Sequence, residues 1–182
     1  MNALSLVRGF ARNNACANYI LMEACNVLSL AELHEKRTSF FPTILMTLNH
    51  NLIVDWYYLD ALLAEGRGRS VFDRGDEPFS ELEPLREAQR AADKKLVAFT
   101  EELATEAALA KPVSLDRRDG TQVEETGNVL LHLFQHQIHH RGQAHAMLAG
   151  TRVPPPPLDE FFLEADLPLR KKPLDALGLP LR

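Results

Sequence analysis

The chain has 182 residues, of which 46% are hydrophobic and 25% are charged, an ordinary composition for one globular domain. Its net charge of −5 argues against nucleic acid or an anionic membrane surface as a partner, because proteins that bind these carry a basic face. No apolar run approaches the about 18 residues of a membrane span, and Arg8 and Arg12 interrupt the stretch where a signal peptide would be apolar, so we expect a soluble, cytoplasmic protein.

The N-terminal part of the chain predicts one long helix and one short turn. Apolar residues recur every three or four positions over residues 3–27, as on one face of a helix. Ser29 and Glu32 form a capping-box pattern that starts a short helical turn through Leu33. The polar residues 34–39 then indicate a loop.

A second helix is predicted over residues 40–63. Pro42 fits its first turn, and Gly66 and Gly68 follow its end. Apolar side chains lie nearly all round this helix, so it should be buried on more than one side. One side would pack in the protein's own core, and the other would be covered by a second subunit or by the C-terminal tail.

The next segment indicates that two helices run in parallel. Residues 64–79 form a polar connection that reaches about 50 Å when it is extended. The second helix is only about 36 Å long, so the connection could return along its whole length. A third helix is predicted over residues 80–109, with Ser80 and Glu83 as a capping box and a charged face, including Asp93, turned to solvent.

A hairpin and a fourth helix complete the predicted domain. Residues 111–123 contain Asp119-Gly120 between two short β-compatible pieces, which indicates a small hairpin. A fourth helix is expected over residues 124–148. Four long helices without a convincing sheet predict an all-α fold, a four-helix bundle over residues 1–153.

Residues 154–182 form a proline-rich tail. They begin with four consecutive prolines, which favour an extended and mostly irregular chain. The apolar run of Phe161, Phe162 and Leu163 predicts that this tail packs on the bundle.

The histidines suggest where chemistry could occur. Five of the seven histidines lie between residues 132 and 145. His136 and His140 are four residues apart and therefore project together from a helix, a spacing that suits two nitrogen ligands of one ion. On a helical wheel they lie at about 110° and about 70° from the centre of the apolar face, whereas His132 and His139 fall nearly opposite it and should face solvent.

Two imidazoles need a third protein ligand to make a good site. His34 falls in a predicted loop, whereas His50 lies midway along the second helix among apolar residues, where an imidazole needs a partner. We therefore take His50, His136 and His140 as candidate metal ligands, and three nitrogens would leave positions open for water or substrate. The competing interpretation is a surface cluster, or a core hydrogen-bond network, of histidines without metal.

Neighbouring polar residues allow two interpretations each. Asp55 and Asp60 could orient the histidines, but local hydrogen bonding or solvent exposure is the simpler explanation. Arg141 and Gln143 are expected in packing and hydrogen bonding, although Arg141 beside a cleft could hold an anionic substrate. The sequence contains no readable pattern of catalytic residues, such as a Ser/His/Asp arrangement or a glycine-rich phosphate loop, so the catalytic residues are unknown.

Three stretches of the chain resemble the DinB family, also described as DinB/YfiT-like metalloenzymes. RNNACAN at 12–18 is similar to that family's RYNxWAN, with Asn13 and Cys16 in place of Tyr and Trp. TLNH within residues 40–63 matches its S-I-x-x-T-L-N-H pattern, and HLFQHQIHHRGQAHAML within residues 130–148 is close to its H-L-F-x-H-Q-x-H-H-R-G-Q-x-H-x-M-L motif.

The resemblance implies a down-up-up-down bundle, commonly a homodimer, with a divalent metal on His50, His136 and His140. Imidazole ligands suit Zn, Ni, Fe, Co or Mn. The implied activity is that of a metal-dependent enzyme of the thiol S-transferase kind, acting on a small thiol and an electrophile, or a hydrolase that uses water. The alternative is a non-catalytic, metal-binding, stress-associated dimer.

Overall fold

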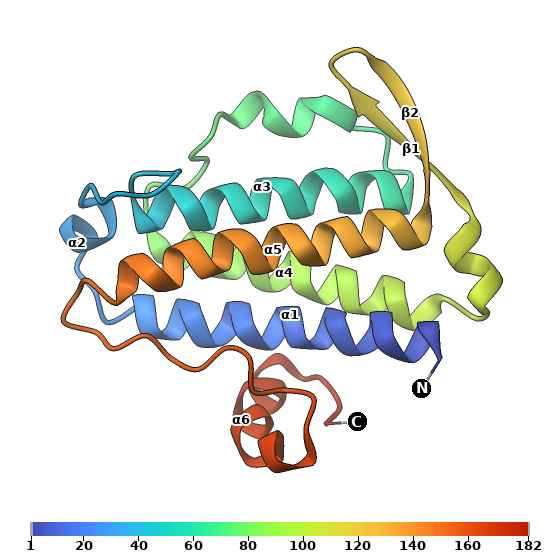
Figure 1. The fold of residues 1–182 in the computed structure, drawn as a ribbon. Helices are drawn as coiled ribbons and strands as arrows, with labels where there is room; N and C mark the ends of the chain where they lie inside the picture. The colour runs from blue at the N-terminus through green and yellow to red at the C-terminus, as the bar shows by residue number, and fades with distance from the viewer. Residues whose placement is uncertain (1, 182) are drawn as a thin grey trace.

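The computed structural model describes residues 2–181 and places four long helices in one bundle (Figure 1). Figure 1 shows α3 and α4 running in one direction, and α1 and α5 running in the opposite one, which is the down-up-up-down order. The predicted all-α bundle is confirmed. Between residues 2 and 181, no helix combines the length and the apolar character needed to cross a membrane. The long helices are α1 (Ala3–Cys25), α3 (Ile44–Leu63), α4 (Leu82–Glu102) and α5 (Thr126–Leu148).

A leucine-rich core holds the four helices together. α1 packs on α4 and α5, and α3 packs on α4 and α5. Burying one leucine side chain contributes about 1.5–3 kcal/mol, so this core fixes α3 beside α5. Each helix contributes leucines that are 0 or 1% exposed, among them Leu21, Leu45, Leu52, Leu85 and Leu130.

α3 begins four residues later than predicted and ends where predicted. The Thr43 side chain accepts a hydrogen bond from the Met46 backbone at 3.0 Å and so caps the helix, which leaves Pro42 outside it. The helix ends at Leu63, and the left-handed residue that follows is Ala64, with φ of 53°, rather than a glycine.

α4 is shorter than predicted at both ends. The predicted capping box is absent, because Glu81 precedes the helix and Glu83 pairs with Arg86 at 2.6 Å. Beyond Glu102 the chain leaves the α-helix and forms the tighter turns of η2 (Glu106–Ala110).

The connection between α3 and α4 returns along α3, as predicted. It contains η1 (Gly68–Arg74), which lies on the outer side of α3 above the bundle (Figure 1). The Asp60 carboxylate holds it by accepting hydrogen bonds from the backbone of Arg67 at 3.0 Å and of Gly68 at 2.7 Å. This connection, with the hairpin, covers the outer side of α3, so the burial of that side needs no second subunit.

The predicted hairpin is present and packs on α3. β1 (Pro112–Arg117) pairs antiparallel with β2 (Gly120–Glu125), and Gly120, with φ of 118°, follows the two-residue turn. Val113 and Leu115 point inward and are buried, whereas every residue of β2 is exposed. The hairpin therefore attaches to the bundle through β1.

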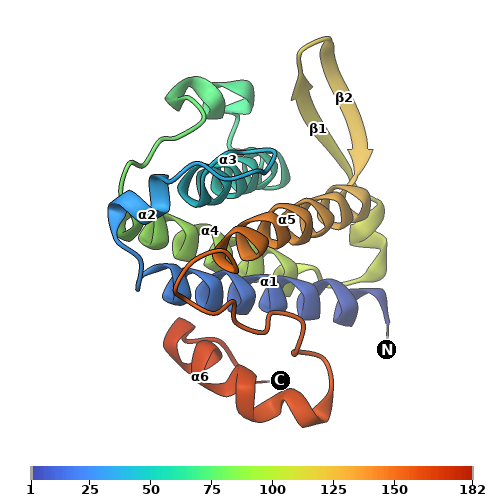
Figure 2. The ribbon, with the colours of Figure 1, turned by 60° about the vertical axis from the view of Figure 1, so that its left-hand side comes forward.

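The tail contains a helix, contrary to the prediction of a mostly irregular segment. After η3 (Glu164–Asp166), α6 (Leu167–Leu177) lies against α1 rather than α3 (Figure 2). A proline in the first turn of a helix loses no hydrogen bond, so Pro168 is compatible with α6.

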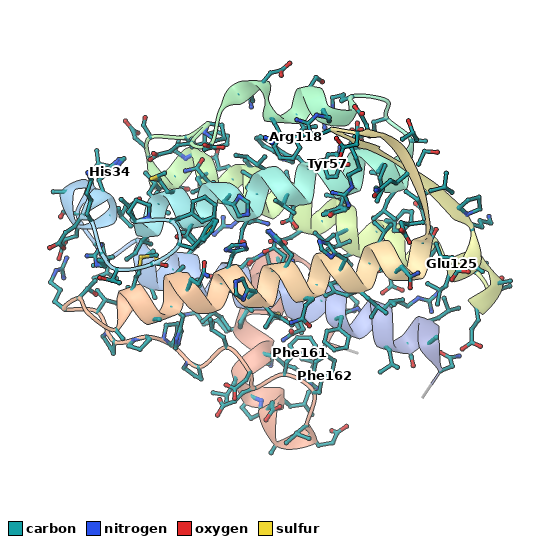
Figure 3. All side chains as sticks on the ribbon, turned by 45° about the horizontal axis from the view of Figure 1, so that its top comes forward. His34, Tyr57, Arg118, Glu125, Phe161 and Phe162 are labelled. Atoms are coloured by element: carbon teal, nitrogen blue, oxygen red, sulfur yellow. The ribbon has the colours of Figure 1, made fainter. Side chains whose placement is uncertain are left out.

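The tail docks through fewer residues than predicted. Phe161 is buried with Leu174 against Cys16 of α1, whereas Phe162 is 49% exposed beside Phe10 (Figure 3). Leu163 is 69% exposed, so its predicted docking is wrong.

Candidate metal centre

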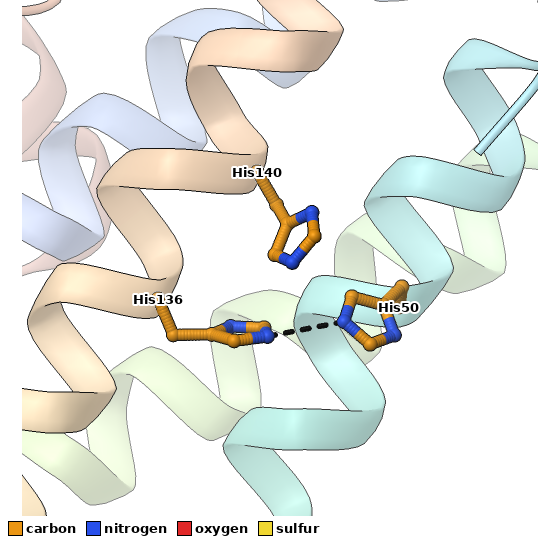
Figure 4. Close-up of side chains that lie close together, drawn as sticks. All are labelled: His50, His136 and His140. Carbon is orange, nitrogen blue, oxygen red and sulfur yellow. Dashed lines mark hydrogen bonds between the residues drawn. The ribbon is translucent and has the colours of Figure 1, made fainter. Parts of the chain in front are cut away.

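Three histidine side chains meet between α3 and α5 (Figure 4). His50 lies midway along α3, and His136 and His140 lie one turn apart on α5. One ring nitrogen from each lies within 4.8 Å of the other two, and the Nε2 atoms of His50 and His136 are 3.0 Å apart. The structure thus brings together the three histidines that the sequence singled out.

The donor set fits a divalent cation. Ligand nitrogens about 2.1 Å from a tetrahedral zinc ion lie roughly 3.4 Å from each other, within the range of separations here. His140 donates from Nδ1 to Gln143 Oε1 at 2.8 Å, which leaves its Nε2 for the cluster. His136 Nδ1 is buried and has no hydrogen-bond partner within residues 2–181, so this imidazole depends on its Nε2 contact.

The chain before α3 shields the cluster. The Phe41 ring lies 4.3 Å from the His50 ring and 5.6 Å from the His140 ring, measured between centroids. Phe40 lies 6.2 Å from His140 and is 77% exposed. One aromatic side chain therefore packs against two of the three imidazoles, a feature that the sequence analysis missed.

All three imidazoles are neutral at pH 7. Burial, and secondarily the nearby His140, lowers the pKa of His50 to about 4. Burial followed by the other two imidazoles lowers the pKa of His136 to about 3, and burial lowers the pKa of His140. Neutral imidazole is the form that binds a metal.

The remaining histidines lie outside the cluster. His132 and His139 are exposed, as predicted, and His139 accepts a hydrogen bond from Gln143 at 3.1 Å. His34 is not in a loop but ends α2 (Leu30–His34), which the predicted Ser29 capping box begins.

The predicted roles of two charged residues are resolved by their contacts. Asp60 bonds locally to η1, the simpler of its two interpretations. Arg141 is buried and donates to the side-chain oxygens of Asn14 at 2.6 Å and Asn18 at 2.9 Å. Arg141 therefore has the packing and hydrogen-bonding role rather than that of an anion ligand.

A buried polar network, which the sequence analysis missed, lies behind the histidines. Gln137 donates to Asp55 at 2.7 Å and to the Asn51 backbone at 2.9 Å, and Gln89 donates to Asp55 at 2.6 Å and to Asp93 at 3.3 Å. Asp93 is 2% exposed, so its prediction as a solvated residue is wrong. Since Gln137 follows His136 and Asn51 follows His50, this network fixes α3 against α5 at the level of the histidines.

The network contains two carboxylates and one guanidinium, all buried. Burial, and then the charge of Asp93, raises the pKa of Asp55. Burial raises the pKa of Asp93 to about 6 and lowers the pKa of Arg141 to about 10. The amide donors of Gln89, Gln137 and the two α1 asparagines oppose the raised pKa values of the carboxylates, and the carboxylate charges oppose the lowered pKa of Arg141, but burial dominates.

A comparison with models of protein families shows to which family the chain belongs. The model of the DinB family matches residues 1–169. The chain belongs to the DinB family. A comparison with curated proteins gives no match. In this DinB chain, Cys16, which departs from the family's motif, is buried beneath the tail.

Proposed function

We propose that this DinB protein is a metal-dependent enzyme whose divalent ion is held by His50, His136 and His140. The observation that carries the proposal is the convergence of three ring nitrogens within 4.8 Å from two adjacent helices. A site with three protein ligands keeps positions for water or substrate, which is typical of catalytic rather than structural centres. Zn, Ni, Fe, Co and Mn all suit imidazole ligands.

The proposed reaction joins a small thiol to an electrophile, and a hydrolysis by water is equally compatible with three imidazole ligands. A bound divalent cation would act as a Lewis acid and lower the pKa of a thiol or of water beside it. Gln143 orients His140 through Nδ1, Gln137 holds α5 against α3, and Phe41 packs against the His50 ring. We also expect a cytoplasmic homodimer, with residues 154–182 as a tail packed on the domain of residues 1–153.

Metal content tests this proposal directly. Elemental analysis of protein purified without a nickel column should give about one equivalent of metal per chain. The double variant His136→Ala/His140→Ala should lose it, while His34→Ala, which changes an exposed histidine on α2, should keep it. Metal-free protein in all three preparations, even after incubation with zinc or nickel, would contradict the proposal.

The second candidate is a non-catalytic metal-binding dimer. The packing of Phe41 over His50 and His140 favours it, because a shielded ion exchanges ligands poorly. Cobalt-substituted protein separates the two candidates. Its visible absorption should change when a small thiol is added if the ion has an open position, and should stay unchanged if the site is closed.

A further inference from the structure

Arg117 lies at one end of the hairpin strand that packs on α3. It follows Val113 and Leu115 on the inward face of β1, because alternate residues of a strand share a face. Its guanidinium lies 5.6 Å from the ring of Tyr57 and 5.7 Å from that of Tyr58. Its Nη2 atom donates to the Tyr58 hydroxyl at 3.2 Å.

No carboxylate within residues 2–181 lies in ion-pair contact with this guanidinium, although the charge of Glu124 acts on it from a greater distance. Arg117 forms no ion pair within residues 2–181, and its buried Nε has no hydrogen-bond partner there. Arg12 and Arg86 also have a buried Nε without a hydrogen-bond partner, but unlike Arg117 they pair with glutamates. A partly buried guanidinium with unused donors, held by aromatic rings, is suited to bind a carboxylate through two parallel hydrogen bonds.

A line of rings connects Arg117 with the three histidines. The Tyr58 ring lies 5.3 Å from the His132 ring, which lies 6.3 Å from the His136 ring. Tyr58 follows His50 by eight residues, which is about 12 Å along α3. His132 is exposed and His136 is partly exposed, so a ligand can reach both from solvent.

We propose, resting on the proposed function, that Arg117 binds a carboxylate of the substrate. The substrate class is a small thiol or electrophile that carries a carboxylate roughly 12 Å from its reacting atom, since Tyr58, which holds Arg117, lies that far along α3 from His50. Arg117 is thus a specificity-determining residue, and the reacting end of the molecule lies beside His50 and His136.

Octanoate is the probe that isolates this contact, because its binding to the metal-free protein does not depend on the ion. Calorimetric titration of the wild type should show saturable binding. Arg117→Gln should weaken it at least about tenfold, the usual effect of losing a charge-assisted pair. Arg118→Gln is the matched control, because Arg118 is the exposed neighbour in the hairpin turn (Figure 3). It should leave the affinity within about twofold.

Three outcomes would overturn the proposal: no saturable binding to the wild type, binding retained by Arg117→Gln, or equal losses in both variants. The hairpin should stay folded in Arg117→Gln, because Tyr57 donates to the Asp116 carbonyl at 2.6 Å and the Arg69 backbone donates to the Asp116 carboxylate at 3.0 Å. An unchanged melting temperature checks this. Tyr58→Phe, which removes only the hydroxyl that holds Arg117, should weaken octanoate binding as well.

Zinc-loaded protein identifies which substrate carries the carboxylate. If mercaptooctanoate binds more tightly than octanoate only when zinc is present, the carboxylate belongs to the thiol. If zinc does not change the affinity for mercaptooctanoate relative to octanoate, the carboxylate belongs to the electrophile. The loss of octanoate binding in Arg117→Gln then remains the test of the proposal. The metal content of Arg117→Gln should equal that of the wild type. Metal content therefore tests the proposed metal site, and octanoate binding tests the role of Arg117 independently of it.

Discussion

At the scale of single residues, the orientation of one imidazole depends on one amide. Gln143 accepts from His140 Nδ1 at 2.8 Å, and such partners fix the ring that binds a metal. Gln143→Leu should lower zinc affinity roughly 10- to 100-fold, measured by competition with a chelator. Gln135→Leu, an exposed glutamine on the same helix, is the control and should change it little. Equal affinities for all three proteins would show that His140 needs no such partner.

The buried Asp93 should make the stability of the protein depend on pH. Burial raises its pKa from 3.8 to about 6, so the folded state binds more protons than the unfolded state between these values. Its contribution to the free energy of unfolding therefore falls as pH rises from about 4 to about 6 and stays low above that. The facing groups are Asp55, which disfavours a second charge, and Arg141, which favours it.

Asp93→Asn removes this titration and keeps an oxygen for the three amide donors around it. Urea unfolding should show the variant gaining stability relative to the wild type as pH rises from 4 to 7. Asp119→Asn, in the exposed hairpin turn, should track the wild type at every pH. A difference between Asp93→Asn and the wild type that does not vary with pH would contradict the assignment.

At the scale of elements, the hairpin depends on one strand for its attachment. Leu115 of β1 is 2% exposed, whereas Val123 of β2 is 63% exposed. Leu115→Ala should lower the free energy of unfolding by about 2–5 kcal/mol, because it leaves a cavity against α3. Val123→Ala should change it by less than about 0.5 kcal/mol. Denaturant unfolding measures both, and similar losses would mean that β2 also packs in the folded protein.

The sequence predicts those features of the fold and of the site that depend on residues close together in the chain. The spacing of His136 and His140 is visible within two helical turns, and His50 could be paired with them because an imidazole among apolar residues requires a partner. Asp93 shows the limit of this approach. It follows Ala92 within a run of charges, and its burial depends on Asn14, Asn18 and Gln89, which only tertiary packing brings to it.

The same limit explains the errors at helix ends and in the tail. Capping depends on which polar group actually reaches the free backbone amides, so Thr43 rather than Pro42 defines the start of α3. Seven of the eleven prolines lie after residue 153, which suggested irregular structure. α6 nevertheless forms because Leu174 and Leu177 gain burial, a contribution that outweighs local propensity.

At the scale of the whole molecule, the tail controls access to one of two cysteines. Burial raises the pKa of both Cys16 and Cys25 to about 12. Cys16 is covered by Phe161 and Leu174 of the tail, whereas Cys25 lies in the main core. Leu174→Ala should loosen the tail and speed alkylation of Cys16, while Cys25 provides an internal control. Mass spectrometry of iodoacetamide-treated protein follows both sites, and equal acceleration would indicate global loosening instead.

The connectivity of the bundle sets the order in which the histidine cluster can assemble. His50 and His136 are separated by 86 positions, and between them lie η1, all of α4 and the hairpin. During synthesis α3 leaves the ribosome long before α5, so His50 emerges without its partners. A cation that joins the two helices acts as a late cross-link across a long loop, where the entropy removed from the unfolded chain is large. Binding of the proposed ion would therefore be the closing event of folding rather than its seed.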